Sequence, residues 1–221
     1  MNTRLTRICL AVAALLAGSL AAQAADLTQP SYKAPAYVAP AYANWSGFYI
    51  GLNGGYGWGK SEWDVPAVSP DPKGALYGGT LGYNFQTGTW VWGLEGDFDG
   101  TSIKGDASCG ATTCTTKLPW LATGRLRLGY AGWSNWLPYI TGGGAYGEVK
   151  AETGAGSTNK DKFGWTAGAG IEWAFLANWS VKVEYLYVDL GKFDCGISCG
   201  ATPDNVTFKA SLGRIGVNYR F

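Results

Sequence analysis

From Trp45 to the last residue, the chain repeats stretches in which large apolar side chains alternate with small or polar ones. Successive side chains of a β-strand point to opposite faces, so each stretch predicts a strand with one apolar face and one small or polar face. The repeat predicts eight strands, at residues 46–58, 74–86, 90–101, 118–131, 136–149, 162–175, 179–191 and 207–221.

The gaps between these strands are alternately short and long. The short gaps lie near 87–89, 132–135 and 176–178, and the long ones near 59–73, 102–117, 150–161 and 192–206. Short periplasmic turns, longer outer loops and an even strand count are typical of outer-membrane barrels. The strands also exceed the roughly 9–11 residues that cross a bilayer when tilted. The pattern therefore predicts an all-β fold, an eight-stranded antiparallel transmembrane up-and-down β-barrel.

Charged residues in these strands share the face opposite the large apolar side chains. In the third strand, for example, Trp92 and Leu94 alternate with Glu95 and Asp97. An eight-stranded barrel is just wide enough for its side chains to fill, and a lone buried charge is costly. We therefore expect an interior network of ion pairs that plugs the barrel, consisting of Glu95, Asp97, Asp99, Arg125, Arg127, Glu172, Lys182, Glu184 and Arg214. The glycine-rich fifth strand gives no assignment of its faces.

Large aromatic residues gather near the strand ends. Amphipathic rings prefer the membrane interface, so two girdles are expected. The periplasmic girdle is predicted to contain Trp45, Phe48, Trp90, Trp136, Phe175, Trp179 and Phe221, and the outer one Trp58, Phe98, Trp120 and Tyr187.

The first residues predict export. Arg4 and Arg7 precede an apolar run over 8–20, and Ala22-Gln23-Ala24 has the small-x-small form of a cleavage site. We expect residues 1–24 to be a cleaved signal peptide rather than an anchor helix, for which the run is short.

The next segment, residues 25–44, is rich in Ala, Pro and Tyr. Proline favours extended polyproline II, so this segment is expected to be a periplasmic tail. It serves either as a flexible spacer or as a tether that touches the cell wall. Residues 45–221 then form the barrel domain.

Composition narrows the function classes. With 17 basic and 16 acidic residues the formal charge is +1, so no strong field attracts nucleic acid. The chain has no His, which removes the commonest general base and the usual triads. We expect no enzyme activity and no cofactor.

Four of the five cysteines lie beyond the signal peptide, in two close pairs. They are Cys109 with Cys114 and Cys195 with Cys199, both in predicted outer loops. An exported chain meets an oxidising compartment, so disulfides are expected. Four cysteines allow three connectivities, of which pairing within each loop is preferred. A four-cysteine zinc site is the weaker alternative, because the spacings are not C-x2-C.

The sequence ends KASLGRIGVNYRF, which resembles the carboxy-terminal assembly signal of outer-membrane barrels, with Phe221 and Tyr219 at the matching positions. The barrel-assembly machinery is therefore an expected partner. Further motifs are WSGFYIGLNGGYGWG at 45–59, GGTLGYNFQ at 78–86, LPYITGGGAYG at 137–147, GWTAGAGIEWAF at 164–175 and VKVEYLYVDLG at 181–191. In this order they are similar to the small outer-membrane β-barrel porin-like family of rhizobia and brucellae, of the OmpA-like membrane-domain type.

The resemblance implies an eight-stranded barrel surrounded by outer-membrane lipid. The favoured function is a structural outer-membrane protein with a plugged polar lumen and surface loops. The alternative is a small porin or ligand-binding transport protein with a narrow conducting lumen, which a conductance measurement distinguishes from the first.

Overall fold

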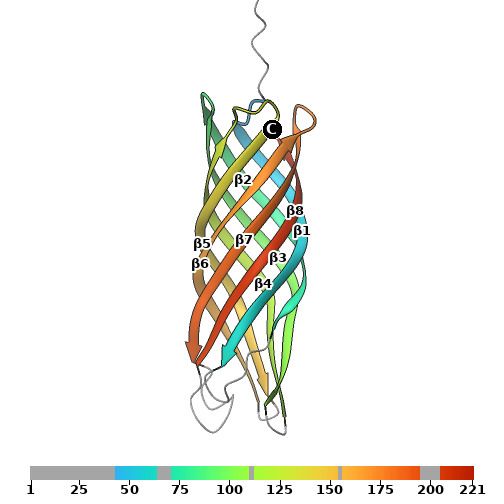
Figure 1. The fold of residues 1–221 in the computed structure, drawn as a ribbon, viewed down its shortest axis with the longest axis vertical. Helices are drawn as coiled ribbons and strands as arrows, with labels where there is room; N and C mark the ends of the chain where they lie inside the picture. The colour runs from blue at the N-terminus through green and yellow to red at the C-terminus, as the bar shows by residue number, and fades with distance from the viewer. Residues whose placement is uncertain (1–42, 64–70, 110–111, 154–155, 195–204) are drawn as a thin grey trace, which may run out of the picture. The chain divides into compact units, whose positions relative to one another are not determined.

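The eight strands of the protein form one closed antiparallel barrel, in which each strand pairs with its sequence neighbours and β8 closes on β1 (Figure 1). The structure, a computed structural model, describes residues 43–63, 71–109, 112–153, 156–194 and 205–221. The strands are β1 (Gly47–Trp63), β2 (Lys73–Thr87), β3 (Trp90–Cys109), β4 (Thr112–Tyr130), β5 (Trp136–Thr153), β6 (Gly156–Ala174), β7 (Trp179–Asp194) and β8 (Asn205–Arg220). The predicted fold class is confirmed.

Two expected segments cannot be compared with the structure. The signal peptide, residues 1–24, and all but the last two residues of the tail, residues 25–44, lie outside the described residues. Within the part of the chain that is described, no helix is long and apolar enough to cross a membrane.

The strands extend further than predicted at the end of the barrel that carries the long connections. β3 runs to Cys109 and β4 begins at Thr112, although residues 102–117 were expected to form a loop. Backbone pairing continues through Ala107 opposite Cys114 to Cys109 opposite Thr112, and the threonines of this segment favour strand structure. The prediction that Cys109 and Cys114 lie in a loop is therefore wrong: both belong to paired strands.

The opposite end carries tight turns. β2 and β3 are joined by Gly88 and Thr89 alone, and Gly88 has φ of 61°. A two-residue hairpin requires a positive φ at its first central position, which glycine adopts without strain. Figure 1 shows this short-turn end at the top, with the C-terminus, and the long-loop end at the bottom.

The seam between β1 and β8 is continuous. Its register runs from Tyr49 opposite Arg220 to Trp63 opposite Val206, and the backbone N–H of Phe221 donates to the carbonyl of Phe48 at 3.0 Å. Closure leaves no unpaired sheet edge, so every strand of the barrel has two neighbours.

The barrel interior has three layers along its axis. A small apolar cluster around Trp45 and Leu137 fills the short-turn end, and charged residues fill the middle. The half towards the long loops is mainly apolar, with the hydroxyls of Ser61 and Thr116 buried among its side chains. We call its apolar members the inner apolar cluster. It consists of Leu76, Ile103, Cys114, Leu118, Leu121, Ala145, Val149, Ala151, Leu186, Val188, Leu190, Phe208, Ala210 and Leu212. The polar interior expected from the sequence therefore covers only part of the barrel.

Trp45 corrects the predicted periplasmic girdle. Its side chain is fully buried, its backbone N–H donates to Oε1 of Gln86 at 2.8 Å, and the Arg220 guanidinium lies 5.1 Å from its ring centre. The segment before β1 thus folds inward and places this ring in the end of the barrel. Phe48 and Phe221, by contrast, are exposed on the outside at that end.

Candidate functional site

The structure brings together in the middle layer all nine charged residues that the sequence selects for the interior. Every one of them is buried, and they come from five of the eight strands. β3 carries Glu95, Asp97 and Asp99; β4 carries Arg125 and Arg127; β6 carries Glu172; β7 carries Lys182 and Glu184; β8 carries Arg214.

Arg125 is the centre of this network. Its Nη1 donates to Oε2 of Glu184 at 2.8 Å, and its Nη2 donates to Oδ2 of Asp97 at 2.6 Å and to Oε1 of Glu95. The side chains of Arg125 and Glu184 are wholly shielded from solvent. One guanidinium therefore neutralises carboxylates on β3 and on β7 at once, which links two walls of the barrel.

Arg214 makes a second branched set of contacts. Its Nη1 donates to Oδ2 of Asp99 at 2.8 Å, and its Nη2 donates to Oε1 of Glu184 at 2.5 Å. The same Nη2 lies 3.4 Å from Oδ1 of Asp97. Asp97 and Glu184 are thus each shared between Arg214 and Arg125, so the two arginines belong to one network.

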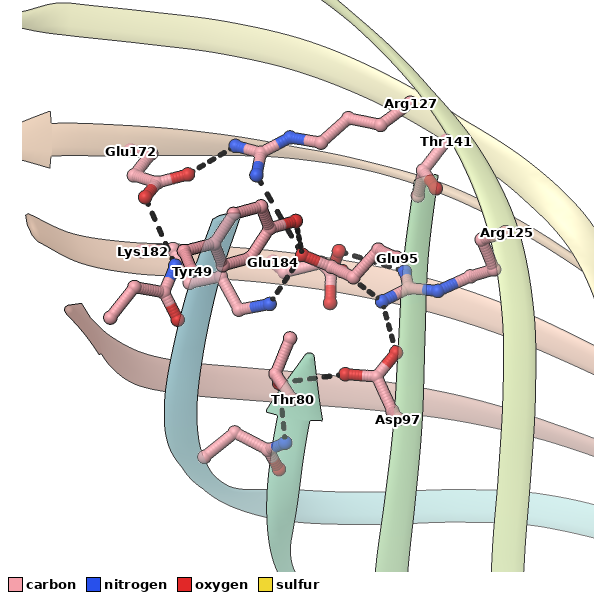
Figure 2. A network of polar contacts seen from close by, with 12 residues as sticks. Tyr49, Thr80, Glu95, Asp97, Arg125, Arg127, Thr141, Glu172, Lys182 and Glu184 are labelled. Atoms are coloured by element: carbon pink, nitrogen blue, oxygen red, sulfur yellow. Dashed lines mark hydrogen bonds and ion pairs between the residues drawn. The ribbon is translucent and has the colours of Figure 1, made fainter. Parts of the chain in front are cut away.

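Towards the short-turn end the network continues through Glu95 and Glu172 (Figure 2). Nζ of Lys182 donates to Oε2 of Glu95 at 3.0 Å. Arg127 pairs with Glu172 through Nη2, and its Nη1 lies 3.7 Å from Oε2 of Glu95. The guanidinium carbon of Arg127 also lies 3.6 Å from the centre of the Tyr139 ring, a cation–π contact.

Neutral polar residues that the sequence reasoning missed add further hydrogen bonds to the carboxylates. The hydroxyl of Tyr49 donates to Oε2 of Glu95 at 2.7 Å, and that of Tyr139 donates to Oε2 of Glu184 at 3.2 Å. Others are Thr80 and Thr123 on Asp97, and Ser180 and Asn218 on Glu172. Their shared inward position in each strand was the available signal, but only charged residues were selected by it.

Two glycines make room for the interior tyrosines. Gly82 lies directly opposite Tyr49, and a Cβ at Gly82 would come within 2.3 Å of the Tyr49 ring. Gly170 lies opposite Tyr139, whose hydroxyl oxygen would be 2.6 Å from a Cβ there. The missing side chains let each ring lie flat across its neighbour and reach a carboxylate of the network.

Arg220 is a further interior cation. It is buried beside Trp45, and its Nη2 donates to the carbonyl of Ala177 at 2.9 Å. With it, the five interior carboxylates are matched by five cations. The interior is therefore close to neutral, as a space of low dielectric requires.

The chemistry open to this site is limited by its pairing. Each of the five carboxylates accepts a hydrogen bond from an arginine or lysine. Glu95 and Asp97 are neighbouring carboxylates of the kind that can act as acid and base, but both are held by Nη2 of Arg125. Among the described residues, no group of three or more His, Cys, Asp or Glu side chains could hold a metal ion. The arrangement is suited to closing a lumen.

The cysteines are only partly described. Cys114 is buried in the inner apolar cluster and is disulfide-bonded. The backbone of Cys109 lies on β3, opposite Thr112. Cys195 and Cys199 lie outside the described residues. The connectivity preferred from the sequence therefore stays a prediction.

The two residues matched to the assembly signal lie at the short-turn end. The ring of Tyr219 packs edge-on against Trp179 at 5.1 Å and against Phe221 at 5.2 Å, measured between ring centres. Phe221 is exposed on the barrel exterior. The two rings form one accessible aromatic patch beside the β1–β8 seam.

Comparison with known proteins agrees with this architecture. The sequence model described as outer membrane protein beta-barrel domain matches residues 10–221. The chain is 36% identical to a 31 kDa outer-membrane immunogenic protein of Brucella melitensis, over 97% of this chain and 98% of that one. It is 34% identical to a 22 kDa outer membrane protein of Rhizobium leguminosarum bv. viciae, over 72% and 70% of the two chains. Among solved structures, Neisserial surface protein A has the same fold, with a TM-score of 0.51 at 13% identity, over 80% of this chain and 98% of that one.

Proposed function

Because the chain belongs to the family of outer membrane protein β-barrel domains, we propose that it is a structural anchor of the bacterial outer membrane, with a closed lumen and loops displayed at the surface. The observation that carries this proposal is that two successive layers of side chains fill the interior of the barrel. The paired charges fill the middle of the barrel, and the inner apolar cluster fills the half towards the long loops.

Each layer opposes ion passage for a different reason. In the middle layer, an ion would have to displace guanidinium groups that already bridge carboxylates, such as Arg125 between Asp97 and Glu184. In the apolar layer, an ion would have to shed its water among groups such as Phe208 and Leu212, which offer it no polar atoms. An eight-stranded barrel leaves little room beside its own side chains.

Planar bilayer recording tests this proposal against a small porin. The full mature protein, reconstituted in lipid, is expected to give no stable current steps, whereas a porin of 16 or more strands inserted in the same way gives them. The double variant Arg125→Ala/Phe208→Ala removes one side chain from each layer. It is therefore the form of the barrel in which a current would be easiest to detect, and it is recorded for comparison. Stable, ion-selective steps from the unmodified protein would overturn the closed lumen and favour the transport alternative.

We extend the proposal to the absence of catalysis. The support is that the interior carboxylates are engaged by cations and that the chain has no histidine to act as general base. Release of phospholipid or peptide fragments by the folded protein, above the level of a Glu95→Gln variant, would contradict this part.

Three partners are proposed. Outer-membrane lipid surrounds the barrel, and the barrel-assembly machinery reads the aromatic patch of Tyr219 and Phe221. Replacing Phe221 with Ala should lower the folded amount in cells while leaving refolding in detergent intact. Residues 25–44 are proposed to contact the cell wall; the test is co-sedimentation of the mature protein with purified peptidoglycan, with a variant lacking 25–40 as its control.

A further inference from the structure

The distribution of polar and apolar side chains between the inside and the outside of the barrel reverses along its axis. A row of aromatic side chains, Trp58, Phe98, Trp120, Tyr146, Trp165 and Tyr185, covers the outside near the long-loop end. Its rings are in contact between β3, β4 and β5, and the Trp58 ring on β1 lies beside that of Tyr185 on β7, across β8. Beyond this row the outside turns polar while the inside becomes the inner apolar cluster. Aromatic girdles mark membrane interfaces, so the strands emerge from the lipid at this height.

Lysines form a band just beyond the aromatic row. We call Lys60, Lys73, Lys104, Lys117, Lys150 and Lys209 the lysine band; they lie on β1, β2, β3, β4, β5 and β8. The strand register places them face to face: Lys209 opposite Lys60, Lys73 opposite Lys104, Lys104 opposite Lys117, and Lys117 opposite Lys150. Like charges directly opposite one another destabilise a sheet, so this register calls for compensating negative charge.

Two members of the band have that compensation within the protein. Nζ of Lys117 lies 2.7 Å from Oε2 of Glu152, and Nζ of Lys150 lies 3.6 Å from Oε1 of Glu148. The remaining four, Lys60, Lys73, Lys104 and Lys209, form no ion pair with any carboxylate of the described residues.

The described carboxylates that lie near those four form no ion pair with them: Asp71 lines the same hollow as three of the lysines, and two further aspartates accept hydrogen bonds from neutral groups. Asp189 lies opposite Lys209 in the register, but its Oδ1 accepts the backbone N–H of Gly191 at 2.8 Å. Oδ1 of Asp106 accepts the hydroxyl of Thr115 at 2.7 Å. Within the described ranges the four lysines therefore have no carboxylate at ion-pair distance, which leaves their ammonium groups accessible to an anionic group from outside the chain.

A hollow on the outer surface collects three of the four lysines. It has a volume of about 450 Å³, and its lining includes Trp58, Lys60, Asp71, Lys73, Tyr187 and Lys209. Trp58 and Tyr187 supply an aromatic side to the hollow, and the lysines supply a cationic one. An amphipathic group that has both an apolar body and a negative charge fits such a surface.

We infer that this hollow binds the phosphate-bearing headgroup of a glycolipid in the outer leaflet of the outer membrane. Lys60, Lys73 and Lys209 contact the phosphate groups, the rings of Trp58 and Tyr187 pack against the sugar and the upper acyl chain, and Lys104 extends the positive surface along the band. Near a membrane surface each lysine is attracted to anionic lipid. The inference rests on the proposed placement in the outer membrane, with the long loops outward.

The test compares two lipids and two charge-matched variants. Folded protein in zwitterionic detergent is titrated with lipid A, which carries phosphates, and with the same lipid after enzymatic dephosphorylation. Binding is followed by calorimetry and by native mass spectrometry. Lys60→Gln/Lys73→Gln/Lys209→Gln alters the hollow. Lys117→Gln/Lys150→Gln/Lys160→Gln removes the same charge elsewhere at that end of the barrel.

The unmodified protein and the control variant should prefer phosphorylated lipid A by about 10- to 100-fold, and the hollow variant should lose that preference. Equal affinity for the two lipids, or equal losses in both variants, would overturn the inference. So would inorganic phosphate alone displacing the lipid at equimolar concentration, since the site would then be one for a free anion. Heat-modifiable gel migration of each variant reports the folded barrel, and conductance separately reports the lumen, so failure of lipid binding is distinguishable from failure of the proposed function.

Discussion

Arg125 on β4 donates a hydrogen bond of 2.8 Å to Glu184 on β7, a strand that is not its neighbour in the barrel wall. The bond therefore crosses the interior and ties opposite parts of the wall together. Both side chains are fully shielded from solvent. A buried ion pair contributes little net stability compared with an apolar pair. Removing one member, however, leaves the other charge buried without a partner, which is costly.

Replacing Arg125 with Met should accordingly destabilise the barrel by about 3–5 kcal/mol, because Asp97, Glu95 and Glu184 lose a shared partner. Urea unfolding in lipid vesicles, followed by tryptophan fluorescence, measures the change. The matched control is Lys117→Met, whose ion pair with Glu152 is well exposed and should cost no more than about 1 kcal/mol. Similar losses in the two variants would show that the network across the lumen has no special role.

Packing around the interior tyrosine Tyr49 can be tested at Gly82, the glycine opposite it. Gly82→Ala would place a Cβ within 2.3 Å of the Tyr49 ring, whereas Gly124→Ala on the outer face meets no atom within 4 Å. We expect the first to cost about 1–3 kcal/mol by overpacking. The second should be neutral or slightly stabilising, because alanine loses less backbone entropy than glycine. The same unfolding measurement compares them, and a neutral Gly82→Ala would mean that Tyr49 can leave Glu95 at no cost.

Much of this fold could be predicted from the sequence because the alternation of side chains along a strand is a local property that does not depend on tertiary contacts. In β3 the alternation of Trp92 and Leu94 with Glu95 and Asp97 identifies both faces, and the structure exposes the first pair and buries the second. In β5 the same reasoning failed. Glycine has no side chain to show a preference, so only the barrel reveals that Tyr139 points inward and Ile140 outward.

The interior was less predictable. Strand alternation places Leu186 and Leu212 on the same face as Glu184 and Arg214, yet their apolar layer was not expected, because a polar lumen was assumed along the whole barrel. Partners within the charged layer depend on barrel curvature and stagger, which no local pattern contains. The burial of Trp45 was missed for a similar reason, since the chain turns inward before the first strand begins.

The inner apolar cluster can be tested at its largest member. Phe208 is fully buried, and Phe208→Ala should cost about 3–5 kcal/mol through lost contacts and the cavity left behind. Its chain neighbour Thr207 faces outward, and Thr207→Ala should change stability by less than about 0.5 kcal/mol. Thermal unfolding, read as the loss of heat-modifiable migration, ranks the two variants. A small effect at Phe208 would indicate that this half of the barrel is loosely filled.

The last prediction concerns the partner of Cys114, which is disulfide-bonded and buried. The register sets Cys109 opposite Thr112 and Cys114 opposite Ala107, so the two cysteines occupy nearby positions on paired strands, five residues apart in sequence. We expect non-reducing peptide mapping of the exported protein to recover a Cys109–Cys114 peptide, with Cys195 joined to Cys199. Closing so short a loop stabilises by only about 2 kcal/mol, so Cys114→Ser should weaken the barrel modestly without unfolding it. The control is Cys199→Ser, which should leave the Cys109–Cys114 peptide intact. A peptide that joins Cys114 to Cys195 would instead show that the disulfide links two hairpins. Reduction would then lower the stability of the barrel much more, because a longer loop is released.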